Sequence, residues 1–186
     1  MSRGVIITDR DRLGLAIVLV RKGKSAALEQ HMRDHFRIEL PQGPHRTTAG
    51  ELALIGMGPG AWLVAHEQAS NALAQSLRKT IGDLASVSDQ SDAYVVLRLS
   101  GPGVREALTK LVPIDVHARA FKVGDVAATV AAHIGATLWR LEDDADGSAV
   151  FEIAVYRSFA TSFWRVLRTS SAFEDGSYSH SARSAN

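Results

Sequence analysis

A strand, a tight turn and a helix are encoded in succession by Ala93-Tyr-Val-Val-Leu-Arg-Leu-Ser-Gly-Pro-Gly-Val-Arg-Glu-Ala-Leu-Thr-Lys-Leu111. The run from Ala93 to Leu99 is apolar and rich in β-branched residues, which is typical of a buried strand. Ser-Gly-Pro-Gly at residues 100–103 turns the chain, and its proline suits the first turn of a helix. Apolar residues then recur at the spacing of one helical face, at Val104, Ala107, Leu108 and Leu111. The pattern predicts a helix packed on a sheet, and it contains no catalytic motif.

The residues before this segment predict a unit of four strands and two helices. We expect strands over residues 13–20, 51–56, 61–66 and 84–88, and helices over residues 25–36 and 69–81. Strand, helix, strand, strand, helix, strand is the element order of a ferredoxin-like unit. Residues 40–46 contain two prolines and a glycine, and they predict a loop.

The residues after it repeat most of that order. We expect strands over residues 93–99, 126–133, 137–141 and 149–156, and helices over residues 104–111 and 159–169, with a break at Gly135. The fold is therefore predicted to be α+β, with two ferredoxin-like lobes of the βαββαβ type packed together as one unit. Residues 1–90 are expected to form the first lobe and residues 91–171 the second, while the polar residues 172–186 form a flexible tail.

Composition limits the classes of function. With 186 residues, of which 46% are apolar, the chain has enough material for one sizeable core or two small lobes. The 21 basic and 20 acidic residues nearly cancel, so nothing in the net charge favours nucleic acid or an anionic membrane. The lack of cysteine excludes disulfides, thiolate nucleophiles and cysteine-ligated metals. The apolar run 13–20 is too short to span a bilayer. We expect a soluble, cytoplasmic protein that binds neither nucleic acid nor membrane.

His31 and His35 are four residues apart on the first predicted helix, so both rings lie on one face. Zinc hydrolases use this spacing with a glutamate directly after the first histidine. Here that position is Met32, and no third ligand is indicated. A solvent-exposed helix face is the better interpretation, and no metal site is predicted.

Other short motifs also lack the residues that their chemistry requires. The glycine-rich segments 56–60 and 100–103 match neither a dinucleotide fingerprint nor a P-loop, so they predict turns. The acidic loop 142–147 resembles part of a calcium loop, but Ala154 stands where the bidentate glutamate belongs. The sequence therefore predicts no catalytic, cofactor-binding or metal-binding residue.

Four residues are candidates for contact with another protein chain: Trp62, Trp139, Trp164 and Arg157. Tryptophan and arginine are enriched at interfaces because each buries a large area and keeps a polar group available. Core packing accounts equally well for any single tryptophan, so both interpretations stay open here.

Several short segments resemble one family when they are read in order along the chain. They are Gly56-Met-Gly-Pro-Gly-Ala-Trp-Leu63, the central segment from Val95, Ile114-Asp-Val-His117, Ala120-Phe-Lys-Val-Gly-Asp-Val126, Leu138-Trp-Arg140 and Val155-Tyr-Arg-Ser158. The series resembles the folate-binding aminomethyltransferase superfamily and, within it, the gamma subunits of heterotetrameric sarcosine oxidases. It runs over nearly the whole chain and implies a fold like the aminomethyltransferase folate-binding domain.

The resemblance implies a structural subunit with no active site of its own. In such enzymes alpha, beta and delta subunits complete a heterotetramer that oxidatively demethylates sarcosine to glycine. Hydrogen peroxide and either formaldehyde or 5,10-methylenetetrahydrofolate are the other products. The resemblance places FAD, FMN, NAD, tetrahydrofolate and zinc on the partner subunits and no cofactor on this chain. Aminomethyltransferases carry Asp-x-Ser before the central strand, and here Ser86 stands at the acidic position.

Two alternatives stay open. The chain could be the equivalent subunit of a complex acting on another N-methyl amino acid, such as an N-methylglutamate dehydrogenase, because the substrate contacts would lie on a partner. It could also be a free-standing folate-binding protein, and that hypothesis predicts that the isolated chain binds tetrahydrofolate.

Overall fold

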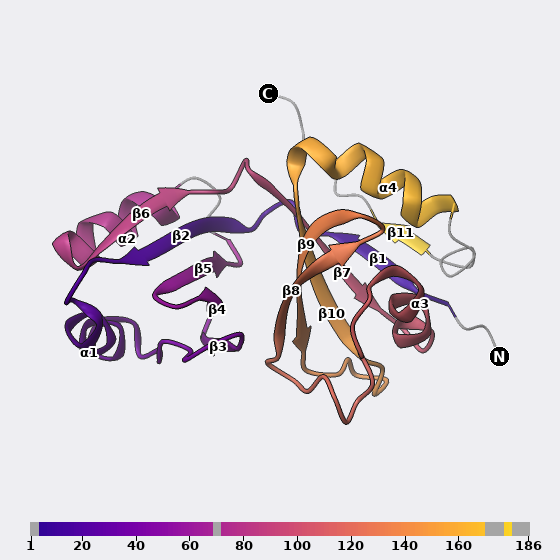
Figure 1. Cartoon of the computed structure of the whole chain (residues 1–186), viewed down its shortest axis with the longest axis horizontal. Coiled ribbons are helices and arrows are strands. Elements are labelled where there is room, and N and C mark those ends of the chain that lie inside the picture. Colours follow the sequence, from indigo (N-terminus) through magenta and orange to yellow (C-terminus); the bar gives the residue numbers. More distant parts are fainter. Residues whose placement is uncertain (1–3, 69–71, 170–176, 180–186) are drawn as a thin grey trace. The chain divides into compact units, whose positions relative to one another are not determined.

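The computed structural model describes residues 4–68, 72–169 and 177–179. The chain divides into two compact units, each built on its own sheet (Figure 1). The first unit is Arg12–Asp92, and the second unit combines Met1–Asp11 with Ala93–Asn186. Both units combine helices with a largely antiparallel sheet, so the predicted α+β class is confirmed.

The first unit has the ferredoxin-like arrangement with one additional edge strand. In chain order it contains β2 (Gly14–Val20), α1 (Ser25–Phe36), β3 (Arg46–Ala49), β4 (Leu52–Gly58), β5 (Ala61–His66), α2 (Leu73–Ile81) and β6 (Ala85–Asp89). The sheet order is β3-β4-β5-β2-β6, and every neighbouring pair is antiparallel. The added strand β3 begins where the predicted loop ends.

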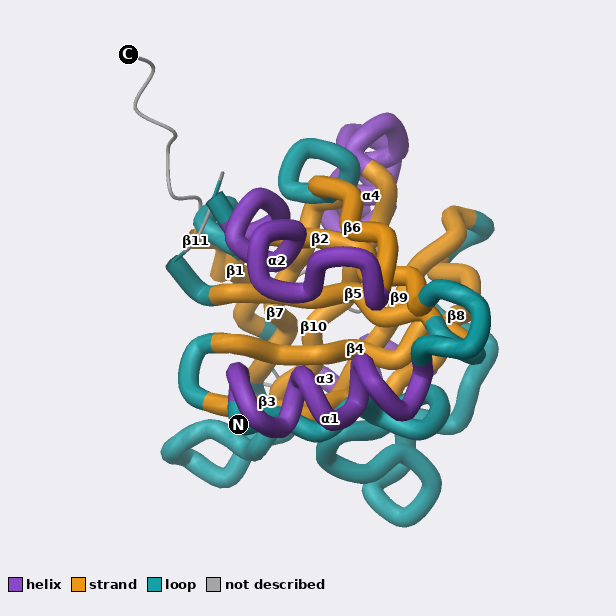
Figure 2. Tube along the Cα trace, turned by 90° about the vertical axis from the view of Figure 1, so that its left-hand side faces the viewer, coloured by secondary structure: helices purple, strands orange, loops and turns teal. Residues whose placement is uncertain are grey.

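Both helices of the first unit cover the same face of its sheet, and in Figure 2 they lie in front of β2, β5 and β4. The core on this face joins Met32 of α1 and Leu77 of α2 to strand residues such as Val18, Leu54 and Val64. Alternate side chains of a strand point to opposite faces, so the apolar residues at even positions of β2, β4 and β5 meet the helices.

The second unit is built on a six-stranded sheet. It contains β1 (Ile6–Asp9), β7 (Tyr94–Ser100), α3 (Val104–Leu111), β8 (Val126–Ala131), β9 (Ile134–Leu141), β10 (Val150–Tyr156), the 3₁₀ turn η2 (Arg157–Phe159), α4 (Ala160–Thr169) and β11 (Ser177–Ser179). The sheet order is β11-β1-β7-β10-β9-β8. Its core includes Leu108 of α3 and Phe163 of α4, both fully buried.

The two units are structural repeats of one pattern. From β2 and from β7 onward, each unit runs strand, helix, three strands, helix, strand. The edge strand β8 takes the place of β3, and β9, β10 and α4 take the places of β4, β5 and α2. The repeats differ beside the first strand, because β6 pairs with β2 whereas β1 is inserted between β7 and β11.

The N-terminal strand changes the expected domain boundary. Residues 1–90 were expected in the first lobe, but β1 pairs with β7 in the register Ile6↔Ser100 to Asp9↔Leu97. Val5 and Ile7 are buried in the core of the second unit. This pairing connects segments that are far apart in the sequence, and no local pattern indicates it. The first lobe therefore starts at Arg12, and the chain enters it from the second unit.

Two further differences concern the C-terminus and a hairpin. Most of the expected flexible tail 172–186 lies outside the described residues, and Ser177–Ser179 forms β11, parallel to β1. The β8–β9 hairpin turns at Ala132 and His133, with φ of 48° and 69°, and not at Gly135. Paired positive φ values are typical of a two-residue hairpin turn, which usually selects glycine or asparagine. Here the turn residues are alanine and histidine, so Gly135 wrongly indicated the position of the turn.

Candidate functional site

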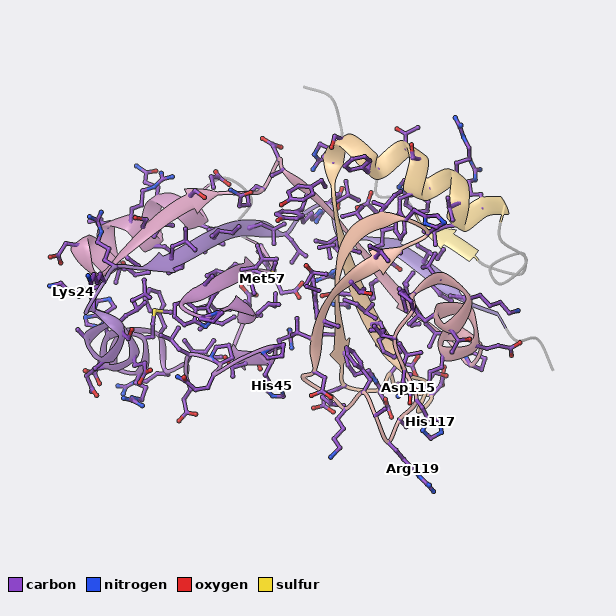
Figure 3. The ribbon with its side chains drawn as sticks, viewed as in Figure 1. Lys24, His45, Met57, Asp115, His117 and Arg119 are labelled. Carbon is purple, nitrogen blue, oxygen red and sulfur yellow. The ribbon has the colours of Figure 1, made fainter. Side chains whose placement is uncertain are left out.

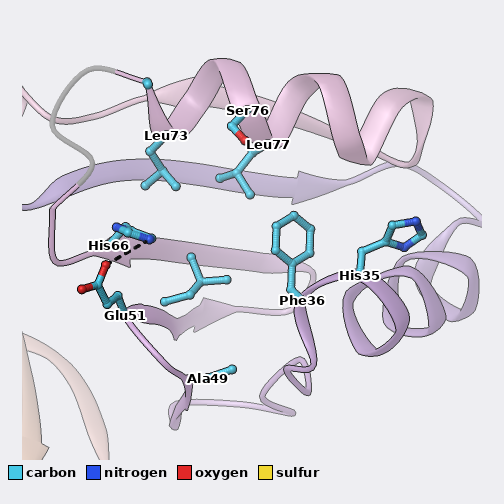
Figure 4. Close-up of a pocket in the computed structure, with 10 residues that line it drawn as sticks. His35, Phe36, Ala49, Glu51, His66, Leu73, Ser76 and Leu77 are labelled. Carbon is cyan, nitrogen blue, oxygen red and sulfur yellow. Dashed lines mark ion pairs between the residues drawn. The ribbon is translucent and has the colours of Figure 1, made fainter.

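The first unit contains a cavity of about 460 Å³ between its two helices and the sheet (Figure 4). Leu52 of β4 and Leu73 and Leu77 of α2 are buried and form apolar walls. Phe36, the last residue of α1, points into the space from the other side. The helix ends there because Arg37 adopts a left-handed conformation with φ of 54° and redirects the chain.

A polar cluster lies at one end of this cavity. His66 Nε2 and Glu51 Oε2 are 3.8 Å apart, and the pair is drawn in Figure 4. Gln68 supports both groups: its side-chain amide donates to Glu51 Oε1 at 2.9 Å, and its backbone N–H donates to His66 Nδ1 at 3.3 Å. Because Nδ1 accepts a hydrogen bond, the neutral imidazole carries its proton on Nε2. The ring therefore directs a donor toward the carboxylate.

The histidine pair of α1 is stacked, with the His31 and His35 ring centroids 4.0 Å apart. Partial burial, followed by the charge of His35, lowers the pKa of His31, while Asp34 acts in the opposite direction. His35 Nδ1 lies 3.2 Å from the backbone carbonyl of His31. In the described part of the chain, no three His, Asp or Glu side chains are grouped so that they could hold a metal ion.

A buried carboxylate organises one face of the second unit. Glu152 is 4% exposed, and its Oε1 accepts from Nε and Nη2 of Arg98 at 3.0 and 2.8 Å. Arg10, which follows β1, forms an ion pair with the same oxygen at 3.0 Å. The indole N–H of Trp139 donates to Oε2 at 2.9 Å. These bonds satisfy the buried charge, as stability requires, and they connect the N-terminal segment to β7, β9 and β10.

A second buried charge lies beside Phe151. The guanidinium of Arg140 is 5.1 Å from the centre of this ring and that of Arg105 is 5.3 Å from it. Arg140 also donates to the carbonyl of Val150 at 2.9 Å and pairs with Asp143. Burial, and then the charge of Arg140, lowers the pKa of Arg105. The aromatic face and the carboxylate compensate two neighbouring cations.

Two of the four predicted contact residues lie inside their units. Trp62 is 6% exposed and donates to the carbonyl of Pro41 at 3.1 Å. Trp139 is 1% exposed and is bound to Glu152. Packing and a hydrogen bond within the chain thus account for both indoles. Their contact with another subunit stays a prediction.

The other two predicted residues lie in successive elements, Arg157 in η2 and Trp164 in α4. Arg157 is exposed, and its guanidinium donates to the carbonyl of Tyr94 at 3.0 Å. Trp164 is partly buried against the core of the second unit. Tyr156 and Phe159 add two aromatic rings that are 51% and 50% exposed. We call Tyr156, Arg157, Phe159 and Trp164 the η2–α4 surface.

The tyrosine of this surface is held in place by a second ring. Tyr156 stacks on Tyr94 with centroids 4.7 Å apart. Burial, and then the hydrogen bond with Tyr156, raises the pKa of Tyr94. Stacking on Tyr94 therefore restricts the exposed Tyr156 ring, which lowers the conformational entropy that the ring would lose on binding a partner.

The loop between α3 and β8 carries Asp115, His117 and Arg119 (Figure 3). The backbone N–H of His117 donates to Asp115 Oδ1 at 2.8 Å, and that of Arg119 donates to His117 Nδ1 at 3.2 Å. These are local turn contacts.

None of the helices in the described ranges is long and apolar enough to cross a bilayer.

The cavity of the first unit was not predicted from the sequence. Its polar groups come from the β3–β4 turn and from the end of β5, and their meeting depends on the register that pairs Leu52 with His66. Neither Glu51 nor His66 belongs to a recognisable motif. Only the pairing of these two strands could have indicated the site.

In sequence, a family model and two curated relatives indicate the same family. A family model described as "Sarcosine oxidase, gamma subunit family" matches residues 17–173. The sarcosine oxidase subunit gamma of Arthrobacter sp is 35% identical over 103 residues, which cover 54% of this chain and 51% of that protein. The subunit gamma of Corynebacterium sp. (strain U-96) is 36% identical over 89 residues, covering 47% and 43%. The chain spans about half the length of these curated relatives in the matches.

Two solved structures share the fold of this chain. A chain of the heterotetrameric sarcosine oxidase from Corynebacterium sp. U-96, in complex with pyrrole 2-carboxylate, matches with a TM-score of 0.79 and 25% identity. The match covers 98% of this chain and 90% of that one. The glycine cleavage system aminomethyltransferase T from Bartonella henselae matches with a TM-score of 0.61 and 16% identity, over 94% of this chain and 47% of that one. This second likeness shows the fold alone, and it confirms the predicted aminomethyltransferase-like architecture.

Proposed function

The chain belongs to the sarcosine oxidase gamma subunit family, and we propose that it is the non-catalytic structural subunit of a heterotetrameric sarcosine oxidase-type flavoenzyme. The observation that carries this proposal is the family match over residues 17–173. The structural match supports it, because a chain of a heterotetrameric sarcosine oxidase superimposes on 98% of this chain. The complex would oxidatively demethylate sarcosine to glycine, with hydrogen peroxide and formaldehyde or 5,10-methylenetetrahydrofolate as the other products.

We assign the cofactors of this complex to its other subunits. The partners are an alpha, a beta and a delta subunit, and FAD, FMN, NAD, tetrahydrofolate and zinc belong to them. By the resemblance to aminomethyltransferases, Ser86 of β6 corresponds to a position where those enzymes carry an acidic residue. A serine hydroxyl offers no anionic charge to a folate ring, which supports a folate site on a partner. The proposed complex is cytoplasmic.

We propose that the η2–α4 surface contacts a partner subunit. It places two half-exposed aromatic rings beside an exposed arginine, which is the composition of binding hot spots. Phe159 is the last residue of η2, directly before α4, and Tyr156 is supported by its stacking on Tyr94. Trp62 and Trp139 stay further candidates for such a contact, although each indole N–H is already bonded within the chain.

Purification of the tagged chain from its native cell tests the proposal. We expect it to bring down a large chain and a flavoprotein, with the visible absorption of flavin, and the complex to turn over sarcosine. Faster turnover of N-methylglutamate than of sarcosine would identify the sister complex instead. A colourless, solitary chain that binds tetrahydrofolate would overturn the subunit proposal in favour of a free-standing folate-binding protein.

A further inference from the structure

The cavity of the first unit has the features of a binding site for a small molecule. Its volume of about 460 Å³ lies in the range of ligand pockets, and its walls are apolar with a few converging polar groups. The lining comes from three separate parts of the chain: the end of α1, the β3–β5 segment with Glu51 in the β3–β4 turn and His66 at the end of β5, and α2 (Figure 4). Leu52, Leu73 and Leu77 offer it an apolar surface.

The polar end of the cavity holds a donor and an acceptor that do not satisfy each other. The proton on His66 Nε2 faces Glu51 Oε2 across 3.8 Å, which is too long for a direct hydrogen bond. Gln68 already binds the opposite atoms, Nδ1 of the ring and Oε1 of the carboxylate. Both groups are thus held in orientation, and with 29% of the His66 side chain and 50% of the Glu51 side chain exposed, each can exchange a solvent partner for a ligand.

The chemistry of this pair selects among ligands. A cationic group would suit Glu51 but would meet the N–H donor of His66, and an anionic group would be repelled by the carboxylate. A hydroxyl group satisfies both, because it accepts from His66 Nε2 and donates to Glu51 Oε2. A hydrogen bond to a carboxylate is charge-assisted and stronger than one between neutral groups.

We propose that this cavity binds a small neutral molecule that combines an apolar ring with one hydroxyl group. The hydroxyl lies between Glu51 and His66, and the ring packs on Leu52, Leu73 and Leu77. Phe36 closes the far side of the ring. This site belongs to the first unit alone, so the proposal does not depend on the subunit function.

Titration of the full chain with phenol and with toluene tests the proposal. The two probes have nearly the same size and shape, and only phenol carries the hydroxyl. With the leucine methyl groups labelled for NMR, we expect saturable shifts at Leu52, Leu73 and Leu77, and phenol to bind about tenfold more tightly than toluene. Benzoate and benzylamine should bind more weakly than phenol. No saturable shifts, or equal affinities for phenol and toluene, would overturn the proposal.

Variants separate the polar end from the apolar walls. His66→Ala and the conservative Glu51→Gln should weaken phenol binding and leave toluene binding unchanged. His117→Ala is the matched control, because its ring likewise accepts a hydrogen bond from the backbone N–H two residues later, at 3.2 Å, but on the loop shown in Figure 3. If His66→Ala and Glu51→Gln keep the wild-type ratio of the two affinities, the proposed recognition is wrong.

A bulky side chain at the cavity gives a test that does not depend on the polar pair. Ser76 lines the cavity from the exposed side of α2, and the adjacent Gln75 is exposed outside it. Ser76→Phe should abolish binding of both probes, and Gln75→Phe should not. Tight binding of either probe to Ser76→Phe would overturn the proposal, because the probes would then bind elsewhere on the chain.

Discussion

The indole N–H of Trp139 donates a hydrogen bond of 2.9 Å to Oε2 of Glu152, and both side chains are buried. The pair lies directly across the β9–β10 ladder, because the register places Trp139 opposite Glu152. Arg98 and Arg10 occupy the other carboxylate oxygen. A buried charge is thus fixed by three residues that come from different parts of the sequence.

Replacement of Glu152 by glutamine should destabilise the protein strongly. The substitution leaves the guanidiniums of Arg10 and Arg98 without the charge that compensates them in a partly buried site. We expect a loss of about 3 kcal/mol in the free energy of unfolding, measured in urea. Glu106→Gln is the control: its pair with Lys110 is exposed and 3.8 Å long, so we expect about 0.5 kcal/mol or less. Similar losses for both variants would contradict this account.

Gly56 should tolerate no side chain. A Cβ atom built at this position would lie 1.8 Å from the backbone oxygen of Gly43, and a backbone atom cannot move aside easily. Gly56→Ala should therefore unfold the first unit or cost about 3 kcal/mol or more. Gly58→Ala, two residues later in β4, meets nothing within 4 Å and should be nearly neutral. Thermal unfolding of the two variants gives the comparison, and equal stability would refute the steric argument.

Local patterns predicted most of the helices and strands, because those elements depend on residues that are neighbours in the sequence. The strand at Tyr94–Ser100 follows from its continuous β-branched, apolar run, and the helix at Val104–Leu111 follows from its apolar periodicity after a turn. Strand β1 was missed because it forms by pairing with β7, which lies far away in the sequence. The β8–β9 turn was misplaced because Ala132 and His133 adopt positive φ without the residues that usually do so.

The site was harder to predict than the fold. Three tryptophans and one arginine were the candidate contact residues, but the sequence does not distinguish an indole whose N–H binds the carbonyl of Pro41 from one at a surface. The exposed rings of Tyr156 and Phe159 were missed, since Tyr156 ends an apolar run and Phe159 shares a helical spacing with Phe163, and both patterns are also typical of a core. The pair of Glu51 and His66 required the register between β4 and β5.

Stability should fall slightly in acid because of His31. Partial burial and the nearby charge of His35 lower its pKa in the folded state, so folding favours the neutral ring. This contribution is present above the ordinary histidine pKa of about 6.5 and is lost as pH falls through the lower folded pKa. His31→Gln should remove part of the decline in unfolding free energy between about pH 7 and pH 5. An unchanged pH profile in His31→Gln would show that other groups cause the decline.

Removal of one ring from the η2–α4 surface should weaken assembly without weakening the fold. Phe159 is 50% exposed, so Phe159→Ala removes little core packing and should leave the urea midpoint nearly unchanged. If the ring inserts into a partner, the affinity should fall by about 2 kcal/mol, as is typical of an interface anchor. Val130→Ala, at a 45% exposed position of β8 outside this surface, is the control and should assemble normally. Sedimentation of the complexes measures the assembly of both variants. Normal assembly of Phe159→Ala would mean that the partner contact lies elsewhere on the chain.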